Sequence, residues 1–197
     1  MGATLQQIAG YIENRGLAYQ IQEEKSRILT HAEGENKDDL LIVAQLDEEG
    51  DFFKLFMPEV LTGVQDHPHK PQILQTMLVI SWETKMLQWE YDPMYGEIRA
   101  IIEFPLEDST LTQRQFDRCF SGLVEMVDSW AIPRLQEVLS TGTDPGDMAL
   151  GERLLLTIEE EAPGLLALLE RAMSARKERG QFPPRRNLPA EEEQQDY

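Results

Sequence analysis

Hydrophobic residues recur first with the spacing of a helix and then with the spacing of strands. Leu5, Ile8 and Ile12 lie three and four residues apart, and Gly16 follows them, which predicts a short first helix closed by a glycine. Alternation of apolar and polar residues then predicts a series of strands. These strands are expected at 17–21, 27–31, 40–46 and 52–57, with the acidic segment 47–51 as the turn between the last two.

A second helix and a hairpin are predicted in the middle of the chain. Pro71 stands where a helix tolerates proline, and an apolar stripe continues from it to Ile80. The clearest strand signal follows, because Leu87, Trp89 and Tyr91 alternate with polar residues. The turn and the second strand of this hairpin are expected at 92–96 and 98–103.

A long helix is predicted after the hairpin. Thr112 and Gln115 have the spacing of a capping box, and apolar residues follow with helical periodicity. Pro133 interrupts this pattern and should kink or divide the helix near Trp130, since proline cannot donate the backbone hydrogen bond. Gly142 is expected to end it.

The character of the chain changes after this helix. Two amphipathic helices are expected at 150–161 and 163–179, separated at Pro163, and the segment beyond them is rich in proline and glutamate. The predicted organisation is an α+β domain at 1–142, a helical extension at 143–180 and a disordered tail at 181–197.

The order of these elements resembles the type III secretion chaperone-like fold, and within it the YbjN family. The resemblance rests on the helix that begins at Pro71, the strand ending in Phe104-Pro105-Leu106-Glu107-Asp108, and the entry to the long helix at Leu111-Thr112. The segment Trp89-Glu90-Tyr91-Asp92-Pro93 is similar to a cyanobacterial or plastid branch. The resemblance covers roughly residues 3–140 and implies an antiparallel sheet flanked by helices. It further implies a non-enzymatic adaptor or chaperone-like role, commonly as a homodimer. Residues 143–197 fall outside the resemblance, and their helices are expected as extra C-terminal elements.

The charge of the chain narrows the classes of partner. Its 36 acidic and 18 basic residues give a formal net charge of −18. Nucleic acids and anionic membranes attract proteins through Lys and Arg patches, so neither is an expected partner. The acidity itself favours solubility, with attraction to a basic client or to cations as the alternative.

Cysteine content and hydropathy favour a reducing compartment, the cytoplasm, with an organelle stroma as the alternative. Cys119 is the one cysteine, so an intramolecular disulfide is not expected, and its helical spacing from Phe116 and Phe120 indicates a small buried side chain rather than a nucleophile. Residues 1–15 contain polar residues throughout and do not resemble a signal peptide. No stretch is apolar enough over the roughly 20 residues that a membrane span requires.

Candidate metal sites are weak in the sequence. His67 and His69 flank a proline in a polar segment, which favours an exposed loop over a metal site. The carboxylates of the 47–51 turn are the ligand type that calcium prefers, but their spacing does not match an EF-hand, so a solvated hairpin turn is the preferred interpretation. No phosphate-binding glycine loop or nucleophile elbow occurs, and no catalytic residue, cofactor or metal site is predicted.

Two features are candidates for partner binding. The first is the aromatic group Trp82, Trp89 and Tyr91; alternation places Trp89 and Tyr91 on one face, favouring the core, and leaves Trp82 as the better surface candidate. The second is the last helix with Leu165 and Leu169, which can dock in a partner groove or pack on its own domain. Pro183-Pro184-Arg185-Arg186 has the form of a short linear motif.

The leading hypothesis is a non-enzymatic binding protein for a protein client, with the sheet and second helix as client or dimer surfaces. The alternative is a small acidic regulatory protein that responds to calcium. An enzyme would require a pocket that gathers polar groups distant in sequence, and a single sequence does not reveal one.

Overall fold

The computed structural model describes residues 2–107 and 109–178. One compact unit extends through Asp147 and a second begins at Met148. The predicted boundary after Gly142 and the predicted tail stay predictions, and the tail lies outside the described residues.

A six-stranded antiparallel sheet forms the first unit's framework, in the spatial order β1-β2-β3-β4-β6-β5. The strands are β1 (Tyr19–Gln22), β2 (Arg27–Ala32), β3 (Leu40–Asp47), β4 (Phe52–Leu61), β5 (Gln88–Asp92) and β6 (Glu97–Pro105). The predicted strands are therefore confirmed, as is the acidic turn, where the short 3-10 helix η2 (Glu48–Gly50) joins β3 to β4.

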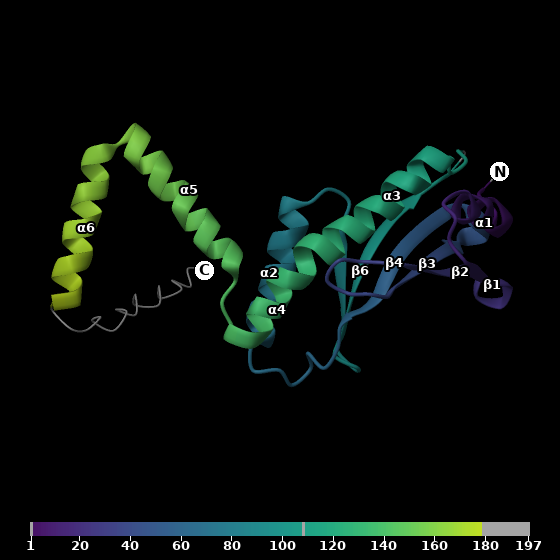
Figure 1. The fold of residues 1–197 in the computed structure, drawn as a ribbon, viewed down its shortest axis with the longest axis horizontal. Coiled ribbons are helices and arrows are strands. Elements are labelled where there is room, and N and C mark those ends of the chain that lie inside the picture. The colour runs from purple at the N-terminus through teal and green to yellow at the C-terminus, as the bar shows by residue number, and fades with distance from the viewer. Residues whose placement is uncertain (1, 108, 179–197) are drawn as a thin grey trace, which may run out of the picture. The chain divides into compact units, whose positions relative to one another are not determined.

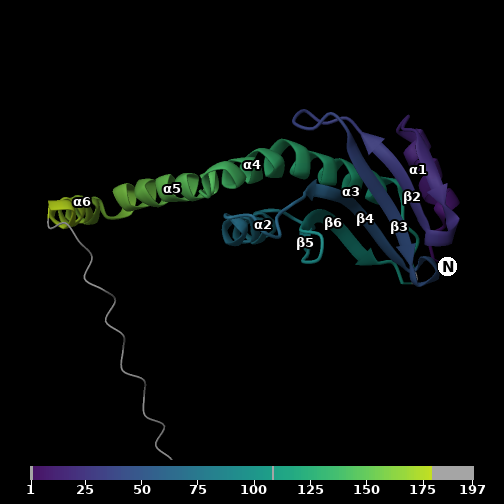
Figure 2. The same cartoon turned by 90° about the horizontal axis from the view of Figure 1, so that it is seen from below.

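Helices cover one face of this sheet (Figure 1, Figure 2). They are α1 (Leu5–Asn14), α2 (Lys70–Glu83), α3 (Gln113–Glu125) and α4 (Ile132–Thr141). Alternating strand residues such as Ile42, Leu55 and Ile102 point to the helices and build one core with Ile8 and Phe116. The structure is thus an α+β fold with an antiparallel sheet flanked by helices.

The predicted helix signals act as expected. Thr112 and Gln115 form the capping box at the start of α3, and Gly142 ends α4 in a left-handed conformation. The division at Pro133 is also confirmed, because a π-helical turn, η3 (Met126–Ala131), separates α3 from α4. This turn carries the buried carboxylate of Asp128.

The opposite face of the sheet carries a smaller apolar cluster of Val43, Phe56 and Ile101, which are buried. The guanidinium of Arg99 lies 5.4 Å from the centre of the Phe56 ring. Arg99 also pairs with Glu90 on the neighbouring strand β5. Charged side chains therefore cross this face and leave little of its apolar surface accessible.

The described part of the second unit is helical. The helices α5 (Pro145–Glu161) and α6 (Pro163–Glu178) confirm the two predicted helices and their separation at Pro163, although α5 begins earlier than the periodicity predicted. It begins early because Asp144 accepts a hydrogen bond from the Gly146 N–H, which stabilises the first turn.

Candidate partner-binding surfaces

The outward face of α2 exposes large apolar side chains. Leu78 is 73% exposed and Trp82, one turn later, is 89% exposed. Met86 is exposed just beyond the end of the helix. Residues four apart on a helix are neighbours, so Leu78 and Trp82 form a continuous apolar strip. The predicted exposure of Trp82 is confirmed.

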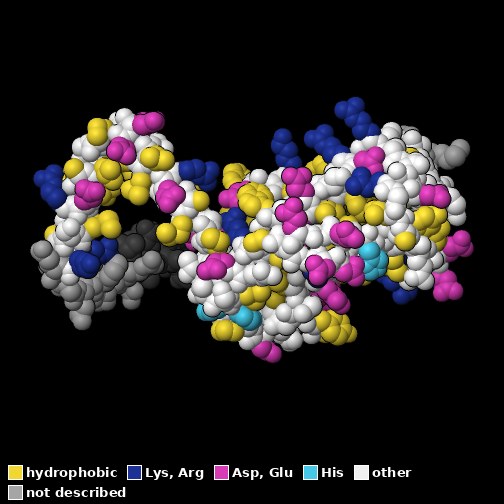
Figure 3. All heavy atoms as spheres, in the orientation of Figure 1, with side chains coloured by type: hydrophobic (Ala, Val, Ile, Leu, Met, Phe, Trp, Pro, Cys, Tyr) yellow, Lys and Arg dark blue, Asp and Glu magenta, His cyan; other side chains and the backbone are white. Residues whose placement is uncertain are grey.

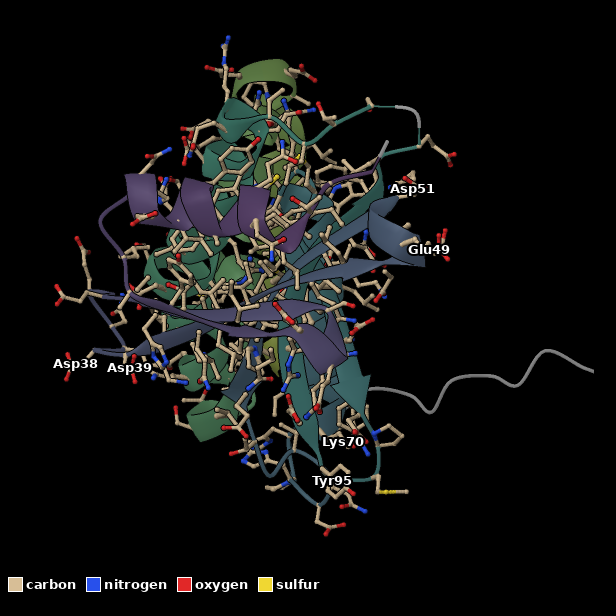
Figure 4. The ribbon with its side chains drawn as sticks, turned by 90° about the vertical axis from the view of Figure 1, so that its right-hand side faces the viewer. Asp38, Asp39, Glu49, Asp51, Lys70 and Tyr95 are labelled. Carbon is tan, nitrogen blue, oxygen red and sulfur yellow. The ribbon has the colours of Figure 1, made fainter. Side chains whose placement is uncertain are left out.

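Trp89 and Tyr91 lie on the inner face of β5 and pack against the main core, which confirms their predicted orientation. Lys70 Nζ lies 4.9 Å from the centre of the Tyr91 ring, and Figure 4 shows Lys70 at the same end of the unit as Tyr95. Trp89 Nε1 and the Tyr91 hydroxyl are buried without a hydrogen-bond partner among the described residues. These two aromatics therefore support the sheet edge and are not brought together with Trp82 as one surface.

In the second unit, both helices expose large apolar side chains along their length (Figure 3). Leu165 is 45% exposed and Leu169 is 41% exposed. Across residues 148–177, no residue is buried. The exposed large apolar residues of this unit are Met148, Leu150, Leu154, Leu155, Leu156, Leu165, Leu168, Leu169 and Met173.

A buried ion network joins α2, α4 and the start of α5 within the first unit. Arg134 donates from Nε and Nη2 to the Asp144 carboxylate at 2.6 and 2.8 Å, and from Nη1 to Glu83 at 2.6 Å. The hydroxyl of Thr76 donates to Asp144 at 3.1 Å. Both Arg134 and Asp144 are buried. Sequence reasoning missed this network, because an Arg and an Asp on either side of a helix end give no signal of burial.

Burial by itself raises the pKa of the Asp144 carboxyl, but the hydrogen bonds from Arg134 and its other donors outweigh burial and hold the pKa below its ordinary value. The hydrogen bond to Asp144 is the main cause that raises the pKa of Arg134. Arg134 therefore stays charged, and the network is intact at neutral pH.

The network predicts a loss of stability in acid. A carboxyl whose pKa is lower in the folded state than in the unfolded state stabilises the folded state. This stabilisation is complete when the pH is above the unfolded-state pKa and is lost as the pH falls through the folded-state pKa. The unfolded value for Asp144 is 3.8, so its contribution should decline below about that pH. Denaturant unfolding at a series of pH values should show a steeper acid loss for the native chain than for an Arg134→Met/Asp144→Leu variant. Equal slopes would contradict the assignment.

The acidic residues considered for metal binding lie in separate parts of the α+β unit. Asp47 accepts hydrogen bonds from Lys54 and Gln45 at 2.8 Å each, and these lower its pKa. Figure 4 shows Glu49 and Asp51 on the opposite side of the molecule from Asp38 and Asp39, so the acidic loops do not meet. Across residues 2–107 and 109–178, no group of three or more His, Cys, Asp or Glu is placed to hold a metal ion.

The predicted loop at His67 and His69 and the predicted buried cysteine are confirmed, but the two histidines are half-buried rather than exposed. His67 and His69 lie in a turn before α2, with ring centres 5.7 Å apart. Cys119 is a buried free thiol, and burial raises its pKa more than the neighbouring Arg118 lowers it. A raised thiol pKa reduces the thiolate fraction, so Cys119 packs as a small apolar residue.

Comparison with known proteins found two solved structures with partial similarity to this chain. No protein-family model and no curated protein matches the sequence. A chain from the structure of the HopA1–SchA chaperone–effector complex is 16% identical, with a TM-score of 0.43, over 61% of this chain and 87% of that one. The structure of YbjN from E. coli is 11% identical, with a TM-score of 0.46, over 68% of this chain and 89% of that one.

The identities and TM-scores of both structures are low, so neither assigns a function to this chain. Membership of the YbjN family and of a cyanobacterial or plastid branch stays a prediction. In the described part of the chain, no helix is both long and apolar enough to cross a membrane.

Proposed function

We propose that this chain is a non-enzymatic adaptor or chaperone-like protein that binds a protein client. The observation that carries the proposal is the exposure of large apolar side chains on α2, α5 and α6. Soluble proteins rarely expose large contiguous apolar surfaces unless a partner covers them. Tryptophan, such as Trp82, is also enriched among the residues that contribute most to binding energy.

Charge and helical form favour protein as the partner class. The net charge of −18 opposes binding to nucleic acid and to anionic membrane surfaces. A helix with an exposed apolar strip can dock in a partner's groove. A second copy of the chain is the alternative occupant of the same strips. A cytoplasmic location agrees with a single buried thiol, Cys119.

No observation on the described residues favours the calcium-responsive alternative, because Asp47 already pairs with Lys54 and the acidic loops lie apart. Adding calcium to the purified protein should leave its melting temperature and circular dichroism spectrum unchanged. A rise in melting temperature that saturates with calcium would restore that alternative.

The test of client binding is affinity capture from native lysate with full-length tagged variants. One variant carries Leu78→Gln and Trp82→Gln on α2, and a second carries Leu165→Gln and Leu169→Gln on α6. A control carries Met94→Gln and Tyr95→Gln, which are 70% and 72% exposed at the turn between β5 and β6. We expect one or both test variants to lose a client that the native chain and the control retain, by about tenfold or more for each hot-spot side chain removed.

A client lost from the α2 variant places recognition on the α+β unit, and a client lost from the α6 variant places it on the second unit. Size-exclusion chromatography of the same proteins tests self-association. A dimer that only the test variants lose would assign the strips to a homodimer instead of a client. Capture that is equal for all four proteins would contradict the proposal.

A further inference from the structure

A groove of about 1110 Å³ lies between the end of α1, the loop that joins β2 to β3, and α3 with η3. Its apolar lining comes from Leu17, Ala32, Phe120 and Val124. Phe120 is buried, while the other three are half-buried and accessible from the groove. The groove thus offers an apolar floor that is distinct from the strip on α2.

Unpaired carboxylates surround this floor. Glu33, Glu35, Asp38 and Glu125 line the groove and are exposed. None of these four side chains has a hydrogen bond or ion pair among the residues that the structure describes. Figure 3 shows acidic side chains gathered over the β2–β3 loop.

The basic groups of the groove are already engaged. Arg15 donates to Asp117 at 3.0 Å and to the Ser121 hydroxyl at 3.1 Å, and its guanidinium lies 4.5 Å from the centre of the Phe120 ring. His31 Nδ1 is 2.6 Å from the Asp39 carboxylate. The unsatisfied charge of the groove is therefore negative.

The loop that carries Glu33, Glu35 and Asp38 is held in place by Asp128. Its buried carboxylate accepts the backbone N–H groups of Glu35, Asn36 and Lys37 at 2.6 to 3.3 Å. A Cβ atom added at Gly34 would lie 2.4 Å from the same carboxylate, so glycine lets the loop approach. The groove is therefore formed before any partner binds, which lowers the entropic cost of binding.

The chemistry of the groove selects the occupant. Anions are repelled by its carboxylates, and among the described residues no three metal-ligating groups converge on a cation. A small cation would also leave the apolar floor in water. An occupant that fits both features carries Lys or Arg side chains beside apolar side chains, because the former meet the rim and the latter cover the floor.

We propose that this groove binds a segment of a partner protein in which basic and apolar side chains lie next to each other. The proposal rests on the function proposed above and adds the chemistry of the partner. It also gives the acidity of the chain a local role, since charge complementarity at the rim speeds association and excludes acidic partners.

The test uses the full-length protein and short labelled peptides, with binding followed by fluorescence anisotropy. The first peptide alternates arginine and leucine; one companion replaces leucine with serine, and another replaces arginine with glutamate. We expect the first peptide to bind with an affinity that falls as salt is added. Both companion peptides should have affinities at least about tenfold lower than the first. Equal binding of the serine peptide would overturn the role of the apolar floor.

Variants locate the site. Glu35→Lys with Glu125→Lys reverses two charges of the rim. The matched control, Glu24→Lys with Glu49→Lys, makes the same change of net charge at exposed, unpaired carboxylates elsewhere. The groove variant should bind the first peptide about tenfold more weakly, while the control should keep most of the native affinity. An equal loss in both variants would assign the binding to overall charge and overturn the proposal.

The outcomes separate the two proposals. If lysate capture depends on α2 or α6 but the peptide does not bind, the groove proposal fails and the proposed function stands. If the peptide binds and only the groove variant loses it, the groove proposal is supported whatever the α2 and α6 variants show. Circular dichroism melts of both charge variants confirm that each is folded.

Discussion

The Arg134→Met variant should lose about 3–5 kcal/mol of unfolding free energy, the cost of leaving a buried charge without its partner. Asp144 would keep its burial and its Thr76 and Gly146 donors but would lose both hydrogen bonds from the guanidinium. Methionine retains much of the aliphatic packing, so the loss reports the charge rather than a cavity. Chemical denaturation followed by circular dichroism measures it.

An exposed pair gives the control for this prediction. Arg99 pairs with Glu90 on the open face of the sheet, where both side chains are more than two-fifths exposed. Arg99→Met should therefore cost less than about 1 kcal/mol. The double variant Arg134→Met/Asp144→Leu should recover part of the loss, because no buried charge is then left unpaired. An Arg134→Met variant as stable as Arg99→Met would refute the importance of the network.

The Asp128→Ala variant should lose about 3 kcal/mol, because one buried carboxylate accepts hydrogen bonds from three backbone N–H groups and each such bond contributes about 1 kcal/mol net. Asp128→Asn should show a smaller loss, since an amide keeps one acceptor oxygen. Hydrogen exchange measured by mass spectrometry should show faster exchange at residues 35–37. Ser129→Ala, at the exposed neighbouring position, is the control and should change neither stability nor exchange.

Asp128→Ala also links the fold to the proposed groove. Release of the loop that carries Glu35 and Asp38 should weaken binding of the arginine–leucine peptide. If exchange at 35–37 stays slow in Asp128→Ala, the carboxylate does not hold the loop, and the account of a preformed groove is wrong.

Local patterns in the sequence were sufficient to predict the elements and the fold class. Alternation at Leu87, Trp89 and Tyr91 specified a strand and its buried face, because side chains on a strand point to opposite faces in turn. Thr112 with Gln115 specified the start of α3, and Pro133 specified its division from α4. These signals depend on residues a few positions apart, so they can be read without a structure.

The tertiary structure decided which of these residues are accessible and which distant residues meet. Trp82 and Trp89 are both aromatic and seven positions apart, yet one is exposed on α2 and the other is packed against the core. Asp128 reaches the 35–37 loop from more than ninety positions away. The groove lining comes from the segment after α1, from β2 and the loop that follows it, and from α3 and η3. Such contacts arise when the helices pack on the sheet. The spacing of apolar residues along the chain does not predict them, because it depends only on residues that are close in sequence.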